Sequence, residues 1–177
     1  LLTNLEKGIT HVYGFDLLNQ QVFTRSIAHY GAGSDWNQET APSISENSYL
    51  LGNTLYYVQA SSDSLCLQVT DFNTGQPIKT YLVSRDENIS FKNSPIIQEG
   101  GAYDFGDKRE LGKTRQLLRK MSNGDALVMA TQENGKQVQV VVGSYTKVTS
   151  GSGGGGMWMG GGAPGSPSVY IPSGGFS

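Results

Sequence analysis

The chain has little of what most catalytic and metal-binding sites are built from. It contains one cysteine, Cys66, and two histidines, His11 and His29. A single cysteine excludes an internal disulfide framework and a zinc site built on several cysteine ligands. The histidines do not have metal-ligand spacing with each other or with Cys66. We therefore expect no cofactor and no metal, and we expect Cys66 to be a strand residue of the core. Structural or surface roles are favoured for both histidines, with pH sensing or catalysis as the alternative.

Long apolar runs and strong charge are also missing. No stretch approaches the roughly 18–20 apolar residues that a helix needs to cross a bilayer, so no transmembrane segment is expected. Residues 1–20 have no basic start followed by an apolar stretch, as a signal peptide would. The net charge of −2 argues against general binding to nucleic acid. Because the sequence opens with Leu1 rather than Met, we expect a processed product or an excerpt of a longer protein.

Carboxylates offer one possible ligand site. Asp35 and Glu39 bracket Trp36, and an aromatic face beside hydrogen-bonding side chains suits a carbohydrate. In an enzyme, the pair or Asp104 would have to converge on Trp36 in a cleft, because glycoside hydrolysis depends on the distance between two carboxyl groups. A loop rich in Asp, Asn and Gln is also typical of an exposed turn. A carbohydrate-binding or carbohydrate-active domain is therefore the alternative function.

Alternation of apolar and polar residues is the strongest pattern that is present. It predicts three strand–turn–strand units at residues 11–27, 65–83 and 126–142, and a further strand pair at 48–51 and 54–59. Alternation indicates half-buried strands, because successive side chains point to opposite faces of a sheet. Asn134-Gly135 is a strong hairpin signal, since both residues tolerate the positive φ of a tight turn. We expect an all-β chain of antiparallel sheets.

One segment departs from this pattern and is rich in helix formers. Leu111, Leu118 and Met121 recur on one side of residues 107–123, and Asn123-Gly124 is a suitable helix stop. We expect one short α-helix at 113–121. Basic residues are concentrated there, and they predict that the helix contacts an anionic surface. The alternative is that they form a solvated helix face. The residues assigned to this contact are Lys113, Arg115, Arg119 and Lys120.

Two of the hairpins share more than alternation. Asp16 and Asp71 each precede a glutamine by five residues, and an apolar–polar alternation follows each. The segment 69–78 resembles the outer hairpin of a β-propeller blade. This resemblance implies part of a β-propeller-type repeat protein of bacterial origin, in which a four-stranded sheet recurs with insertions. A β-sandwich would also arise from such hairpins, so the sheets are expected to be propeller blades or the layers of a sandwich.

The composition changes abruptly at residue 149. We divide the chain into an antiparallel β domain at 1–148 and a Gly-rich C-terminal arm or linker at 149–177, because Gly-rich sequence is costly to order. Met157, Trp158 and Met159 stand between glycine runs in the arm. Large apolar side chains of this kind favour binding to a partner, so we expect these three residues to dock on another protein subunit. Packing back onto the chain's own β domain is the alternative.

Together these features favour a non-catalytic structural or protein-interaction module of a larger bacterial assembly. The abundance of Asn, Gly, Ser and Thr fits an extracytoplasmic setting, at the cell surface or secreted.

Overall fold

The computed structural model describes residues 2–31, 43–99, 108–133, 137–146 and 170–171, and the elements reported below lie within these ranges. They comprise twelve strands and one helix. The elements are β1 (Leu2–Glu6), β2 (Ile9–Asp16), β3 (Gln21–Ala28), β4 (Ser45–Leu51), β5 (Thr54–Ala60), β6 (Ser64–Asp71), β7 (Pro77–Ser84), β8 (Ile97–Glu99), β9 (Lys108–Glu110), α1 (Thr114–Ser122), β10 (Asp125–Glu133), β11 (Gln137–Tyr145) and β12 (Tyr170–Ile171).

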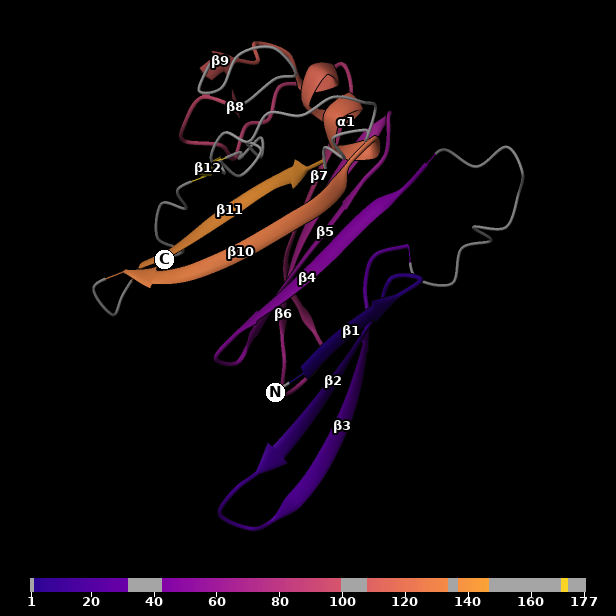
Figure 1. Cartoon of the computed structure of the whole chain (residues 1–177), viewed down its shortest axis with the longest axis vertical. Helices are drawn as coiled ribbons and strands as arrows, with labels where there is room; N and C mark the ends of the chain where they lie inside the picture. Colours follow the sequence, from indigo (N-terminus) through magenta and orange to yellow (C-terminus); the bar gives the residue numbers. More distant parts are fainter. Residues whose placement is uncertain (1, 32–42, 100–107, 134–136, 147–169, 172–177) are drawn as a thin grey trace, which may run out of the picture.

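The described strands form four sheets in which every pairing is antiparallel. Three larger sheets have the strand orders β1-β2-β3, β4-β5-β6-β7 and β10-β11-β12, and β8 and β9 form a small fourth sheet. Neighbours in each sheet are also neighbours in sequence, so each larger sheet is a meander (Figure 1). The predicted antiparallel all-β fold with one short helix is therefore confirmed. The predicted hairpins and strand pair correspond to β2–β3, β6–β7, β10–β11 and β4–β5.

Sequence patterns did not indicate β1, β8, β9 or β12. In β1 the apolar residues Leu2 and Leu5 are three positions apart, which is not the period of a strand. The turn into β2 places Lys7 at φ 50° and Gly8 at φ 73°, so a lysine occupies a left-handed position that usually takes Asn or Gly. The last of these strands, β12, lies in the Gly-rich arm and pairs with Val140 and Val141 of β11.

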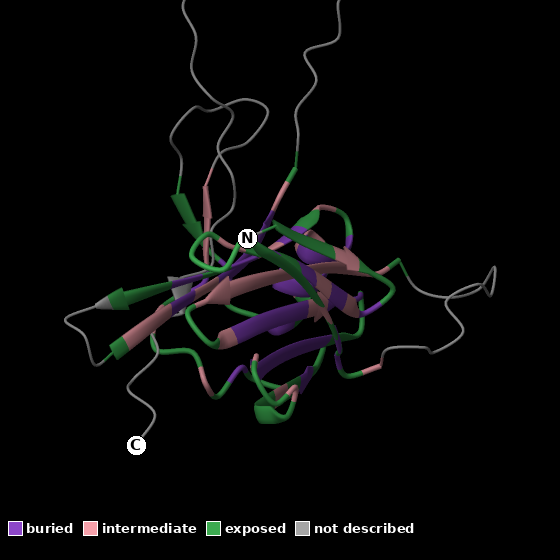
Figure 2. Ribbon diagram, turned by 90° about the horizontal axis from the view of Figure 1, so that it is seen from below, coloured by how far each residue is buried: buried purple, intermediate pink, exposed green. Residues whose placement is uncertain are grey.

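The β4–β7 sheet is the central layer of the molecule. One face packs against β10, β11 and α1, and the opposite face packs against the β1–β3 sheet (Figures 1 and 2). The first contact is a continuous apolar core. Its fully or almost fully buried members are Tyr56, Val58, Ala60, Leu65, Leu67, Val69, Val83, Ile89, Ile96, Leu111, Leu117, Leu118, Met121, Ala126, Val128, Ala130, Val140 and Val142.

Helix α1 closes one end of this core. Leu117, Leu118 and Met121 are buried on the face that meets the sheets, while the opposite face carries basic residues. The helix ends at Ser122, one residue after the predicted end, and Gly124 follows at a position with no room for a side chain. A Cβ added there would lie 2.8 Å from the Tyr145 carbonyl oxygen. The short connection allows β10 to begin directly beside the helix.

The first strands of the three larger sheets lie close together (Figure 1). Strand β10 runs alongside β4, and side chains join them: the Ala126 N–H donates to Ser45 Oγ at 2.6 Å, and the Val128 N–H donates to Asn47 Oδ1 at 3.2 Å. At the β1–β2 turn, the Gly8 N–H donates to Glu46 Oε1 at 3.3 Å. Strand β4 thus stands between the first strands of the other two sheets.

Candidate functional site

The β1–β3 sheet has one covered face and one open face. Val12 points to the covered face and is fully buried against the central sheet. The strand register places Leu2 beside Tyr13 and Phe15 beside Val22 on the opposite face. These side chains are exposed by 75%, 44%, 55% and 71%, respectively. We call this set, Leu2, Tyr13, Phe15 and Val22, the outer apolar face.

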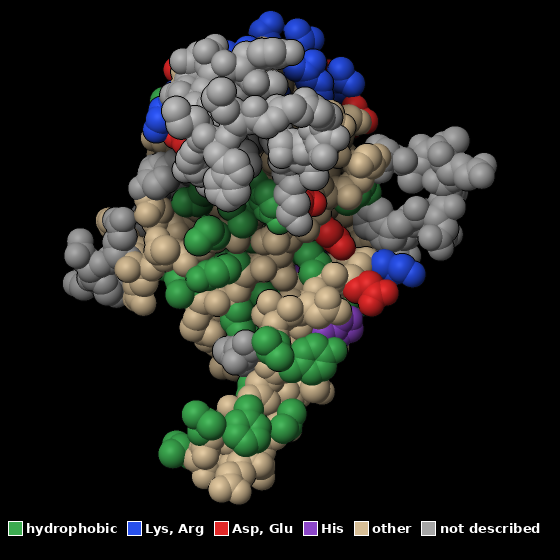
Figure 3. Space-filling model, in the orientation of Figure 1, with side chains coloured by type: hydrophobic (Ala, Val, Ile, Leu, Met, Phe, Trp, Pro, Cys, Tyr) green, Lys and Arg blue, Asp and Glu red, His purple; other side chains and the backbone are tan. Residues whose placement is uncertain are grey.

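The outer apolar face extends to the tip of the β2–β3 hairpin, which projects from the body of the molecule. Hydrophobic side chains gather at this projecting end in Figure 3. Leu17 and Leu18 at its tip are 80% and 95% exposed. A surface with this many large apolar side chains in one place is unusual for an isolated protein and is typical of an interaction site.

The tip of this hairpin is held in shape by Asp16. Its carboxylate accepts hydrogen bonds from the N–H groups of Leu18 and Asn19, at 2.9 and 3.2 Å, and from the Asn19 side chain at 2.7 Å. These bonds, the Asn19 side chain first, hold the pKa of Asp16 below its ordinary value. The apolar side chains are therefore presented on an ordered turn.

Close approach of a ring to the backbone also shapes the hairpin. Phe23 lies over Gly14, its partner across the strands, and a Cβ on Gly14 would be 2.0 Å from the Phe23 ring. Glycine is therefore required at this position for the aromatic ring to lie flat on the sheet.

A second apolar face, partly exposed, lies at the other end of the stack of sheets. In the β10–β11 pair, Val128 and Val142 face the core, so their neighbours Leu127, Met129 and Val141 point away from it. Met129 is 43% exposed, and Leu127 and Val141 are half-buried. We call these three residues the second apolar face.

A buried polar cluster fills the contact between the β1–β3 sheet and the central sheet. The His29 ring stacks on Tyr57 with ring centroids 4.0 Å apart, and His29 Nε2 is hydrogen-bonded to Thr10 Oγ1 at 2.7 Å. Its Nδ1 atom is buried with no hydrogen-bond partner in the described part of the chain. Burial lowers the pKa of His29 to about 4, because the charged ring would lose its hydration. His29 is therefore neutral at physiological pH.

The neighbouring polar groups link the two sheets. Glu46 accepts a hydrogen bond from the Tyr57 hydroxyl at 2.8 Å, and Gln68 Oε1 accepts one from the Tyr30 N–H at 2.7 Å. Burial is the main cause that raises the pKa of Tyr57. Cys66 is buried in β6, as predicted, and burial raises the pKa of its thiol to about 11. A neutral buried thiol is a poor nucleophile, so this cluster joins the sheets and does not present a reactive group to solvent.

His11 has a different environment from His29. It lies on the open side of the β1–β3 sheet, where Nδ1 is hydrogen-bonded to Ser26 Oγ at 2.8 Å. It therefore borders the outer apolar face as a polar neighbour.

The predicted basic surface is present on α1. Lys113, Arg115 and Arg119 are exposed and Lys120 is half-buried. A shallow cavity of about 210 Å³ lies at the start of the helix, but carboxylates line it together with the basic groups. Mixed charge does not select an anion, so contact with an anionic surface stays a prediction. The lining residues are Arg85, Asp86, Glu87, Asn88, Lys113, Thr114 and Arg115.

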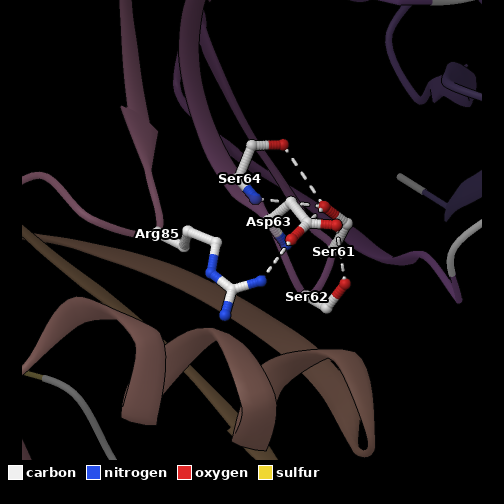
Figure 4. A network of polar contacts seen from close by, with 5 residues as sticks. All are labelled: Ser61, Ser62, Asp63, Ser64 and Arg85. Atoms are coloured by element: carbon white, nitrogen blue, oxygen red, sulfur yellow. Dashed lines mark hydrogen bonds and ion pairs between the residues drawn. The ribbon is translucent and has the colours of Figure 1, made fainter.

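One of these basic residues is engaged elsewhere. Arg85, directly after β7, forms an ion pair at 3.0 Å with Asp63 of the β5–β6 turn (Figure 4). Hydrogen bonds from Ser62 and Arg85 lower the pKa of Asp63. In the same turn, Ser61 Oγ accepts hydrogen bonds from the N–H groups of Asp63 and Ser64, at 3.2 and 3.1 Å. This network orders a turn of the central sheet and leaves Arg85 less available to a ligand.

Several predicted site residues lie outside the described residues. These are the carbohydrate candidates Asp35, Trp36 and Glu39, the carboxylate Asp104, and the arm residues Met157, Trp158 and Met159. The turn residues Asn134 and Gly135 lie outside them as well. Within the described ranges, no cluster of three or more His, Cys, Asp or Glu side chains could hold a metal ion. The described part of the chain also has no helix with the length and apolarity to cross a membrane.

The outer apolar face was not identified from the sequence, although the strands that carry it were. Alternation shows that Tyr13 and Phe15 share a face but not whether that face is covered. Comparison with known proteins found no matching family model, no similar curated protein and no similar solved structure.

Proposed function

We propose that the chain is a non-catalytic structural and protein-interaction module, an arc of three sheets of the β-propeller type within a larger assembly. Propellers arrange four-stranded antiparallel meanders around a central axis, with the sheets packed face to face. The β4–β7 sheet is such a meander, with its strands in chain order. The close approach of β1, β4 and β10, the first strands of the larger sheets, supports a radial arrangement around a common axis.

The outer apolar face is the observation that carries the interaction role. Exposed apolar side chains of this size are costly in water, and they lie on a regular strand pair rather than in a loop. We infer that the partner is another antiparallel sheet with an apolar face. This chain packs sheet on sheet on both sides of β4–β7, so the same kind of contact would cover its open end.

If the outer apolar face is a docking surface, its side chains add little to the stability of the chain's own fold. Stability measurements on variants test this. At protein concentrations low enough for the chain to be monomeric, the double variant Phe15→Ser with Val22→Ser should unfold at the same temperature as the wild type, since neither side chain is buried in the folded chain. The control Val12→Ser changes the fully buried residue on the other face of the same sheet and should lose about 2 kcal/mol or more.

Binding of a hydrophobic dye gives a second measurement on the same proteins. At protein concentrations low enough for the chain to be monomeric, the wild type should bind the dye at the outer apolar face, and the double variant should bind less. A loss of stability in the double variant as large as that of Val12→Ser would show that the face belongs to the chain's own core. That result would overturn the proposed interaction role.

A further inference from the structure

We propose that the outer apolar face of one copy of this chain packs against the second apolar face of another copy, so that two copies close into a ring of sheets. This inference rests on the proposed function, because it assumes that the three sheets form an arc. It adds the identity of the partner, which is a second copy of the chain.

The two faces have matching chemistry. Tyr13, Phe15 and Val22 form the centre of one, and Leu127, Met129 and Val141 form the other. None of these side chains is charged, so the contact buries no unpaired charge. Each face lies on the side of an antiparallel strand pair that points away from the central sheet, and the inner side of that pair already packs on the central sheet. Stacking one on the other therefore repeats a contact that the fold makes twice.

The arrangement of the sheets favours a closed assembly over an endless one. A contact between two different faces forms a ring when the rotation between copies closes, and a filament when it does not. The closest contacts between neighbouring sheets are made by their first strands, β1 with β4 and β10 with β4, and this favours a stack that turns about these strands. Two arcs of three sheets would supply six sheets, within the range of roughly four to eight blades found in propellers. In such a ring each copy uses both of its faces.

Sedimentation of purified chain over a range of concentrations tests this arrangement. The wild type should form a discrete dimer. Phe15→Lys and Met129→Lys should each be monomeric, because either change removes both contacts of a two-copy ring. An equimolar mixture of these two variants should form a 1:1 complex, weaker than the wild-type dimer, because one of the two contacts keeps both of its intact faces.

The matched control is Ile78→Lys, which places the same charge on an exposed apolar position of β7, outside both faces. This control should remain dimeric, and circular dichroism should show that all three variants are folded. A wild type that stays monomeric, or a mixture that stays monomeric, would overturn the inference. A species that lengthens steadily with concentration would overturn the closed ring.

The outcomes also separate this inference from the proposed function. A monomeric wild type whose Phe15→Ser, Val22→Ser variant keeps full stability would retain the outer apolar face as a docking surface while excluding a second copy as its partner. Loss of stability in the monomeric variant would instead show that the outer apolar face belongs to the chain's own core, and both the proposed function and this inference would be wrong.

Discussion

The two faces of the central sheet β4–β7 are both covered, but they are built from different side chains. Strand β6 shows the contrast within one segment. Leu65, Leu67 and Val69 point into the apolar core, and the intervening residues Cys66, Gln68 and Thr70 point toward the β1–β3 sheet. All six are buried. An alternating strand therefore does not always have one face in water.

The two contacts stabilise the fold in different ways. Apolar burial is nondirectional and accounts for most of the free energy of folding. A buried polar contact contributes less net free energy, but each group needs its own partner, so the contact fixes one geometry. We expect the face toward β10 and α1 to dominate stability. The face toward β1–β3 sets the register of that sheet and depends on the protonation state of His29.

The largest expected effect lies on the apolar face. Leu118→Ala should lower the free energy of unfolding by about 3 kcal/mol, since Leu118 is fully buried and truncation leaves a cavity. Chemical denaturation measures this loss. The control is Leu82→Ala, the same change at a position that is 53% exposed, and it should cost no more than about 0.5 kcal/mol. Equal losses at the two positions would remove the distinction between core and surface.

The next effect is a pH dependence of the polar face. The pKa of His29 is about 4 in the folded chain and 6.5 in its ordinary range, so the folded state disfavours the proton. The resulting stability is fully present above about pH 6.5 and is lost as the pH falls through about 4. The loss should reach about 3 kcal/mol.

Urea denaturation of the wild type and of His29→Gln at several pH values measures this contribution. His29→Gln should be less stable at neutral pH and should lose less stability on acidification. The control His11→Gln makes the same change outside the buried cluster, and it should cost less stability at neutral pH than His29→Gln. An unchanged pH profile in His29→Gln would contradict the role given to this residue.

The smallest effect compares adjacent tyrosines on opposite faces of β5. Tyr57→Phe removes the hydroxyl that donates to Glu46 and should cost about 1 kcal/mol. Tyr56→Phe keeps the ring that packs in the apolar core and should cost less. Denaturation curves of both variants test the contrast. A larger loss for Tyr56→Phe would mean that hydroxyl hydrogen bonds matter more on the apolar face.

Local signals in the sequence were enough to place most strands and the helix. Alternation located β2, β3, β5, β6 and β7, and the Asn123-Gly124 stop placed the end of α1 within about one residue. Alternation did not predict that Gln68 and Thr70 are buried, because Gln68 accepts a hydrogen bond from Tyr30, far away in sequence, and donates one to Thr70. The periodicity of the sequence does not show which other sheet covers this face, because that contact joins residues far apart in the chain.

The same limit applied to the candidate site. Cys66 was correctly placed in a buried strand, because its neighbours Leu65 and Leu67 are apolar. The outer apolar face was not predicted, because the alternation at Tyr13 and Phe15 is the same as that of strand residues that face a core. Only the stacking of the sheets shows that Val12 and Gly14 face inward and that these two aromatic residues face outward.

The side-chain joint between β4 and β10 has a mechanical consequence. Within each sheet, pulling along the strands would load many backbone hydrogen bonds at once. Between β10 and β4, two backbone N–H groups of β10 instead donate hydrogen bonds to the side-chain oxygens of Ser45 and Asn47. Under tension, we expect this seam to yield before the ladders on either side of it, so that whole sheets separate while their own strands stay paired.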